Sequence, residues 1–117
     1  MTPKEIDRFC VSLPAATRTV QWGGIIVFKV GGKMFCLIAP AHGRTAAHVS
    51  FKCPDEHYEA LSRSDGFRPA PHLARAKWVA LDDPAILTAS EMKAYIRRAH
   101  ATIGAALSKK RQAALGL

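Results

Sequence analysis

Residues 22–39 read WGGIIVFKVGGKMFCLIA, in which two apolar, β-branched segments flank the pair Gly31-Gly32. Glycine adopts positive φ angles at little cost, so this pair suits the turn of a two-residue hairpin. The stretch therefore predicts a β-hairpin in which Val30 lies opposite Lys33.

This register divides the hairpin side chains between two faces, because neighbouring residues of a strand point to opposite sides of a sheet. The pairs expected on the face toward the core are Phe28 with Phe35 and Ile26 with Leu37. The pairs expected on the other face are Val27 with Cys36 and Lys29 with Met34. One hairpin thus predicts both a buried surface and an exposed surface.

Capping signals and hydrophobic periodicity predict the remaining elements. Thr2 and Glu5 form a capping box before a helix that extends to about Ser12. A second capping box begins at Thr88 and precedes a helix that extends to about Lys109. The further elements expected are a helix over 53–64, strands over 17–22, 47–52 and 77–81, and a surface loop over 67–75.

The order helix, four strands, helix, strand, helix predicts an α+β fold, with an antiparallel sheet of about five strands and helices packed on one face. Residues 1–117 are expected to form a single domain, since this length suffices to bury a core. The side chains expected under the helices are Ile26, Phe28, Phe35, Leu37, Val49 and Phe51. Those expected on the second, open face are Lys29, Met34, Cys36, His48, Ser50 and Lys52. The open face is therefore expected to be basic and partly apolar.

Composition indicates the cellular compartment expected for the protein and the kind of partner it favours. No apolar stretch is long enough to span a bilayer, and the start MTPKE lacks the plan of a secretory signal. Cys10, Cys36 and Cys53 are odd in number and widely spaced, which favours a reducing cytoplasm. The formal net charge of +8 favours an anionic partner such as nucleic acid, although many small proteins are basic only to remain soluble.

Five short segments occur together in this chain: Trp22, VFKVGGKMF at 27–35, VSFK at 49–52, PAPHL at 69–73, and Trp78 with Val79. With their joint spacing they resemble the MmcQ/YjbR family of small bacterial proteins, from about Pro14 to the final helix. The resemblance implies a frataxin-like α+β fold and a proposed DNA-binding role in which β-hairpins act as paired wings.

Lys29, Lys33 and Lys52 are the first candidates for contact with phosphate groups. Lys33 lies at the expected hairpin tip, and the other two lie on the expected open face. The alternative is that these lysines provide solubility and protect strand edges against pairing with other chains.

A second group combines basic residues with an aromatic ring: Arg68, His72, Arg75, Lys77 and Trp78. Such a segment can grip phosphates while the ring stacks on a base or occupies a groove. The alternative is that the tryptophans, with their large apolar area, pack against the core or support the proline-rich loop. The run KKR at 109–111 is expected to be a solvated helix end with at most a supporting role in DNA contact.

Neither a metal site nor an active site is predicted, and no cofactor is expected. The histidines and cysteines lack the close spacing of a zinc site, and no sequence context marks Cys36 or Cys53 as an activated thiol. Iron binding in frataxin-like proteins rests on an acidic first helix, whereas Lys4 and Arg8 stand among the acidic residues here.

The leading hypothesis is a cytoplasmic, non-enzymatic protein that binds double-stranded DNA through its phosphates, without sequence specificity. The alternative is a protein-interaction or homodimerisation module, in which a partner covers the apolar side chains of the open face. The side chains assigned to that apolar surface are Ile25, Val27, Met34, Cys36 and Ile38. A continuous basic surface favours DNA, and a buried two-fold interface favours association.

Overall fold

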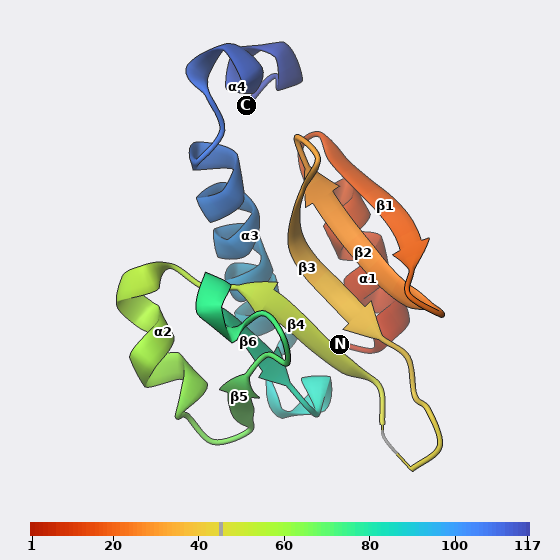
Figure 1. The fold of residues 1–117 in the computed structure, drawn as a ribbon. Helices are drawn as coiled ribbons and strands as arrows, with labels where there is room; N and C mark the ends of the chain where they lie inside the picture. The colour runs from red at the N-terminus through yellow and green to blue at the C-terminus, as the bar shows by residue number, and fades with distance from the viewer. Residues whose placement is uncertain (45) are drawn as a thin grey trace.

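Strands and helices form two layers in the computed structural model, which describes residues 1–44 and 46–117 (Figure 1). Within these residues, six strands form one sheet in the order β1-β2-β3-β4-β6-β5, and every neighbouring pair is antiparallel. The strands are β1 (Ala16–Gln21), β2 (Ile25–Val30), β3 (Lys33–Ala39), β4 (His48–Lys52), β5 (Phe67–Pro69) and β6 (Trp78–Leu81). The helices are α1 (Pro3–Ser12), α2 (Asp55–Ser62), α3 (Ala89–Ala105) and α4 (Lys109–Leu115), with short 3-10 helices η1 (Ala74–Ala76) and η2 (Pro84–Ile86).

The α+β class, with helices packed on one face of an antiparallel sheet, is confirmed. The prediction of about five strands missed β5, which lies in the segment assigned to a loop. A three-residue strand that ends in Pro69 gives too little alternation to be recognised in a sequence. β5 pairs with β6 and extends the sheet at that edge.

The hairpin of β2 and β3 contains a β-bulge that the sequence did not predict. The pairs nearest the turn are as expected, Val30 with Lys33 and Lys29 with Met34. Between Phe28 and Lys29 the register shifts by one residue, so that Phe28 lies opposite Cys36 rather than Phe35. An extra residue in one strand reverses the faces beyond it, because side chains alternate with a period of two.

Because of the bulge, three side chains of β3 lie on the face opposite to the one predicted. Cys36 faces the helices beside Phe35, and both side chains are fully buried. Beyond them, Leu37 points to the second face and Ile38 to the helices. The predicted pairs of Ile26 with Leu37 and Val27 with Cys36 are wrong, since Ile26 pairs with Ile38 and Val27 with Leu37.

The main hydrophobic core lies between the sheet and helices α1, α2 and α3 (Figure 1). The rings of Phe28 and Phe35 lie at its centre, 6.4 Å apart between centroids. His100 of α3 packs edge-on against Phe35 at 5.2 Å, and its Nε2 lies 2.7 Å from the carbonyl oxygen of Pro14. Helix α3 is thus held to the sheet and to the segment that joins α1 to β1.

The second face of the sheet is partly covered, contrary to the expectation of an open face. A smaller apolar cluster lies there, with buried members Val27, Leu37, Ala70, Trp78 and Ala80. Leu73 packs against this cluster from the segment between β5 and β6. That segment, assigned to a surface loop, therefore crosses and covers part of the sheet (Figure 1).

The C-terminal residues form two helices rather than the single helix predicted. Helix α3 ends at Ala105, and α4 begins after Ser108, whose hydroxyl accepts a hydrogen bond from the Arg111 N–H at 3.1 Å. The Gln112 side chain donates to the Leu107 carbonyl at 2.8 Å. These bonds satisfy backbone groups that the break leaves without helical partners. The chain can therefore turn, and α4 lies beside the β2–β3 turn (Figure 1).

The β2–β3 turn approaches this C-terminal region closely. Gly31 has a φ of +59°, and a Cβ there would lie 2.6 Å from Leu107 Cδ1 and 3.3 Å from Leu115 Cδ1. Gly32 has a φ of +79°, but a Cβ there would have no neighbour within 4 Å. Gly31 alone thus combines the left-handed turn with a tight contact to the C-terminal helices.

Candidate nucleic-acid interface

The three lysines predicted to bind phosphate lie in different surroundings. Lys33 is exposed beside the turn of the β2–β3 hairpin, and Lys29 is half-buried on the second face. The Lys52 ammonium donates to the Ala76 carbonyl at 2.7 Å and lies 3.2 Å from Asp55 Oδ1. Its side chain is only 15% exposed, so Lys52 serves mainly to attach the η1 segment to β4.

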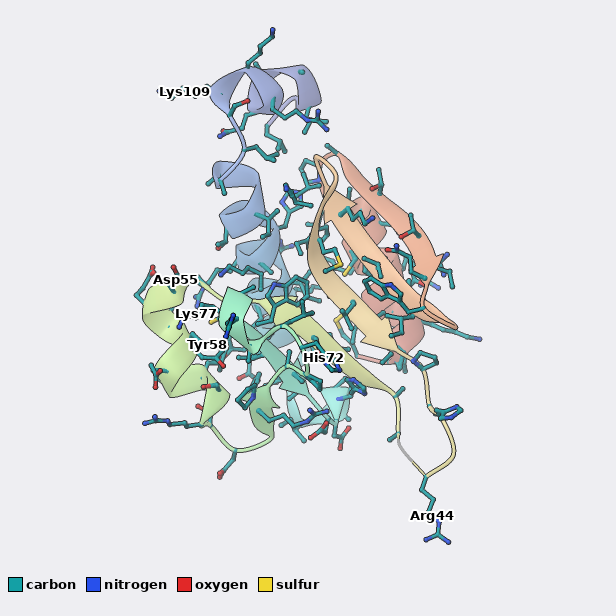
Figure 2. All side chains as sticks on the ribbon, in the orientation of Figure 1. Arg44, Asp55, Tyr58, His72, Lys77 and Lys109 are labelled. Carbon is teal, nitrogen blue, oxygen red and sulfur yellow. The ribbon has the colours of Figure 1, made fainter. Side chains whose placement is uncertain are left out.

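Two residues of the second predicted group already have partners within the protein. The Arg68 guanidinium lies 2.9 Å from Asp82 Oδ1, which links the ends of β5 and β6. The Lys77 ammonium lies 5.1 Å from the centroid of the Tyr58 ring, as a cation–π contact (Figure 2). These contacts partly neutralise or occupy both cations and so make them weaker candidates for a phosphate contact.

The remaining members of that group differ in exposure. Trp78 is 3% exposed and belongs to the smaller apolar cluster, so its ring presents no face on which a base can stack. His72 (Figure 2) and Arg75 are exposed on the segment that covers the second face. Trp22, in contrast, is 63% exposed. The structure therefore does not bring the predicted set together as one basic surface.

A basic group to which the sequence assigned at most a supporting role lies on α4. Lys109, Lys110 and Arg111 are all exposed, and Lys109 projects from the start of the helix (Figure 2). Since α4 lies beside the β2–β3 turn, these side chains are at the same end of the molecule as Lys33. We call these four residues the basic end. The KKR run was visible in the sequence, but the helix break and the contact with the turn were not.

The distribution of charge along the chain strengthens this end. Residues 8–54 contain six Lys and Arg and no Asp or Glu, and residues 92–117 contain another six and no Asp or Glu. The β2–β3 turn belongs to the first segment and α4 to the second, so two segments without acidic residues meet at the basic end. Neither segment therefore contributes an acidic side chain that would weaken anion binding at the basic end.

A recess on the second face is a separate feature, which we call the sheet-face pocket. Its volume is about 580 Å³, and its walls are almost entirely apolar. It lies between the strands and the segment that covers them. The residues that line it are Trp22, Ile25, Met34, Leu37, Ala39, His48, Ser50, Pro71, His72 and Leu73.

Two of the buried thiols, Cys36 and Cys53, are unsuited to nucleophilic chemistry. A hydrogen bond with Cys10, together with complete burial, raises the pKa of Cys36 well above its usual range. Burial likewise raises the pKa of Cys53. Since the thiolate is the nucleophile, both groups are held in the unreactive form.

Among residues 1–44 and 46–117, no group of three or more His, Cys, Asp or Glu is placed to hold a metal ion. In the same part of the chain, no helix is both long and apolar enough to cross a membrane.

The model of the YjbR family matches residues 11–102. The chain belongs to the YjbR family. The matched residues include the β2–β3 hairpin and most of α3, whereas α4 lies beyond them. No curated protein matches this YjbR-family chain in sequence.

Two solved structures share the fold of this YjbR-family protein. The Deinococcus radiodurans protein DR2400, with a DUF419 domain, has a TM-score of 0.86 and 22% identity, over 99% of this chain and 88% of that chain. A protein from Pseudomonas syringae has a TM-score of 0.71 and 17% identity, over 88% of this chain and 99% of that chain. At these identities the likeness concerns the fold alone.

Proposed function

We propose that this YjbR-family protein binds double-stranded DNA through its phosphate groups, mainly with the basic end. The observation that carries the proposal is the contact of the β2–β3 turn with Leu107 and Leu115. This contact brings a hairpin tip and a basic helix from distant parts of the chain to one place. Cations on two elements can follow a longer stretch of phosphate backbone than cations on one.

The chemistry of the basic end suits phosphate rather than bases. Its four side chains are exposed Lys and Arg, which displace the counterions condensed on DNA and so supply affinity on any sequence. The net charge of +8 adds long-range attraction. The proposal therefore includes no sequence preference.

Other basic residues have a smaller part in the proposed contact. Lys29 lies one pair from the hairpin turn and can extend the basic end along the second face. Arg75 and His72 are exposed but lie on the covering segment. Arg68 and Lys77 are engaged with Asp82 and Tyr58, so we assign them no primary contact.

The test is a fluorescence-anisotropy titration of the full chain with double-stranded DNA of several sequences, at a series of salt concentrations. Affinity is expected to fall steeply with salt because counterions are released. In the double variant Lys33→Glu and Lys110→Glu, we expect weaker binding on all sequences and a salt slope smaller by about 2. No measurable binding of the unmodified chain at low salt would refute the proposal.

A matched control separates the basic end from net charge. The double variant Arg63→Glu and Arg68→Glu changes the formal charge by the same amount, but at residues whose partners are Glu59 and Asp82. This control is expected to weaken binding less than Lys33→Glu with Lys110→Glu. Equal weakening by the two pairs would show that only overall charge matters and would contradict the assignment to the basic end.

The alternative of homodimerisation through the second face receives less support from the geometry. Two side chains of the predicted apolar surface, Cys36 and Ile38, point into the main core instead. Ile25 and Met34 line a recess rather than a flat surface. The concave shape suits a small molecule better than a second copy of the same flat sheet.

A further inference from the structure

We propose that the sheet-face pocket binds a small, uncharged aromatic molecule that carries one hydroxyl or N–H group. This site is distinct from the basic end and does not depend on DNA binding. The volume of about 580 Å³ lies within the range of about 300 to 1,000 Å³ that is usual for small-molecule pockets. A pocket of this size accommodates two fused or linked aromatic rings.

The apolar walls come from both sides of the recess. Ile25 of β2 and Met34 and Leu37 of β3 form the floor, and Leu73 of the covering segment forms a wall. Leu37 is 7% exposed and packs in the smaller apolar cluster, so the floor is backed by packed side chains. Removing ligand rings from water against such walls supplies most of the binding free energy.

One exposed aromatic ring borders the pocket. Trp22 is 63% exposed, which is unusual for a large apolar side chain without a partner. Its indole can stack on an aromatic ligand, since offset ring pairs attract each other beyond their apolar burial. This favours an aromatic ligand over a flexible alkyl chain.

His48 supplies the polar contact. Its Nδ1 is buried and, within the described residues, has no hydrogen-bond partner. A buried polar atom without a partner is costly, and rotation of the imidazole toward the recess would let a ligand hydroxyl or N–H satisfy it. Because the described lining includes no Lys, Arg, Asp or Glu, a charged ligand would lack a counter-ion there.

The backbone at the rim supports a binding role. Trp22 has a φ of 47° and His72 a φ of 64°, both in the left-handed region that non-glycine residues rarely adopt. These two residues border the pocket from different segments, whereas Ala15 and Lys77, with φ of 57° and 63°, do not border it. Strained backbone of this kind gathers at ligand sites, where the position of a side chain matters more than local stability.

The test uses N-phenylnaphthylamine, a neutral fluorescent probe with linked aromatic rings and one N–H. The full chain is titrated with the probe, which is excited beyond the absorption of tryptophan. We expect saturable binding of one probe per chain. Met34→Trp and Ile25→Trp each place an indole in the pocket and are expected to weaken binding about tenfold or more. The two variants are independent, so a failure of one to fold leaves the other to decide.

The matched control adds the same ring elsewhere on the sheet. Val20 is 58% exposed on β1 and does not line the pocket, so Val20→Trp is expected to bind the probe as the unmodified chain does. Circular dichroism establishes that each variant is folded. Absence of saturable binding to the unmodified chain, or equal weakening by Val20→Trp, would overturn the proposal.

The role of His48 is tested by competition. Naphthol and methylnaphthalene, which differ mainly in the hydroxyl, displace the probe from the unmodified chain and from His48→Phe. The ratio of the two competition constants is taken within each protein, which removes the effect of the substitution on the hydrophobicity of the pocket. We expect this ratio to favour naphthol about fivefold more in the unmodified chain, as the loss of one hydrogen bond implies. An equal ratio in both proteins would overturn the assignment of His48 as the polar contact.

Discussion

The contact between the β2–β3 turn and the C-terminal helices predicts different costs for alanine at two adjacent glycines. Gly31→Ala and Gly32→Ala both place a Cβ on a backbone with positive φ, at +59° and +79°. This conformation costs an L-residue about 1 to 2 kcal/mol. At Gly32 nothing further is added, because no atom lies within 4 Å of the new Cβ.

At Gly31 the new Cβ would lie 2.6 Å from Leu107 Cδ1, so the leucine or the helix must move. Leu107 is half-buried and can move in part, so we take the lower half of the usual overpacking cost, about 1 to 2 kcal/mol. The total for Gly31→Ala is therefore about 2 to 4 kcal/mol, against about 1 to 2 kcal/mol for Gly32→Ala.

Urea unfolding followed by circular dichroism measures both free energies of unfolding. In a Leu107→Ala background, the added cost of Gly31→Ala is expected to fall most of the way to that of Gly32→Ala, because the two nearest methyl groups are gone and Leu115 Cδ1, at 3.3 Å, remains. Equal costs for the two glycines in the unmodified chain would refute the contact. Strict additivity of Gly31→Ala with Leu107→Ala would refute it as well, and with it the basis for placing α4 beside the hairpin.

Further substitutions test packing, thiol chemistry and helix capping. Phe35→Ala removes a fully buried ring and is expected to lower the free energy of unfolding by about 3 to 5 kcal/mol, measured in urea. Cys36 is expected to react with iodoacetamide only after unfolding, because its raised pKa keeps the thiol protonated, and rapid labelling of the folded chain would contradict this. Thr88→Ala is expected to cost about 1 kcal/mol by removing the cap of α3, again by urea unfolding. The backbone N–H of Thr88 lowers the pKa of Glu91 below 4.5, so its stabilising contribution is full above that pH and is lost as the pH falls through the folded pKa. Glu91→Gln should reduce this acid dependence of the unfolding midpoint, and an unchanged profile would contradict it.

The elements predicted correctly depend on short stretches of sequence. The Gly31-Gly32 turn, with Val30 opposite Lys33, follows from the φ preferences of glycine. The capping box of Thr2 and Glu5 needs only a hydroxyl and a carboxylate three residues apart, and both of its hydrogen bonds are present. Such features are fixed within a few residues, so they can be read without knowing what packs around them.

The elements predicted wrongly depend on contacts between distant residues. The break between α3 and α4 interrupts a stripe that includes Ile103 and Leu107, and helical periodicity alone predicts that it continues. The break places α4 against Gly31, more than 70 residues earlier in the chain, and local periodicity does not reveal this contact. Likewise, the sequence predicts that Arg68 is available to bind phosphate, because no neighbouring residue indicates its ion pair with Asp82 across the β5–β6 pair.

The bulge explains how one hairpin can serve a core, a pocket and a basic end. Had alternation continued unbroken, Leu37 would point to the helices and Cys36 to the second face. The extra residue instead places Phe35 and Cys36 together in the core and returns Leu37 to the pocket floor. The turn side of the bulge keeps its register, so Lys33 remains beside α4 whatever happens at the pocket. The two proposed sites therefore share a strand pair but use different side chains of it, with Lys33 beside the turn and Ile25, Met34 and Leu37 on the second face.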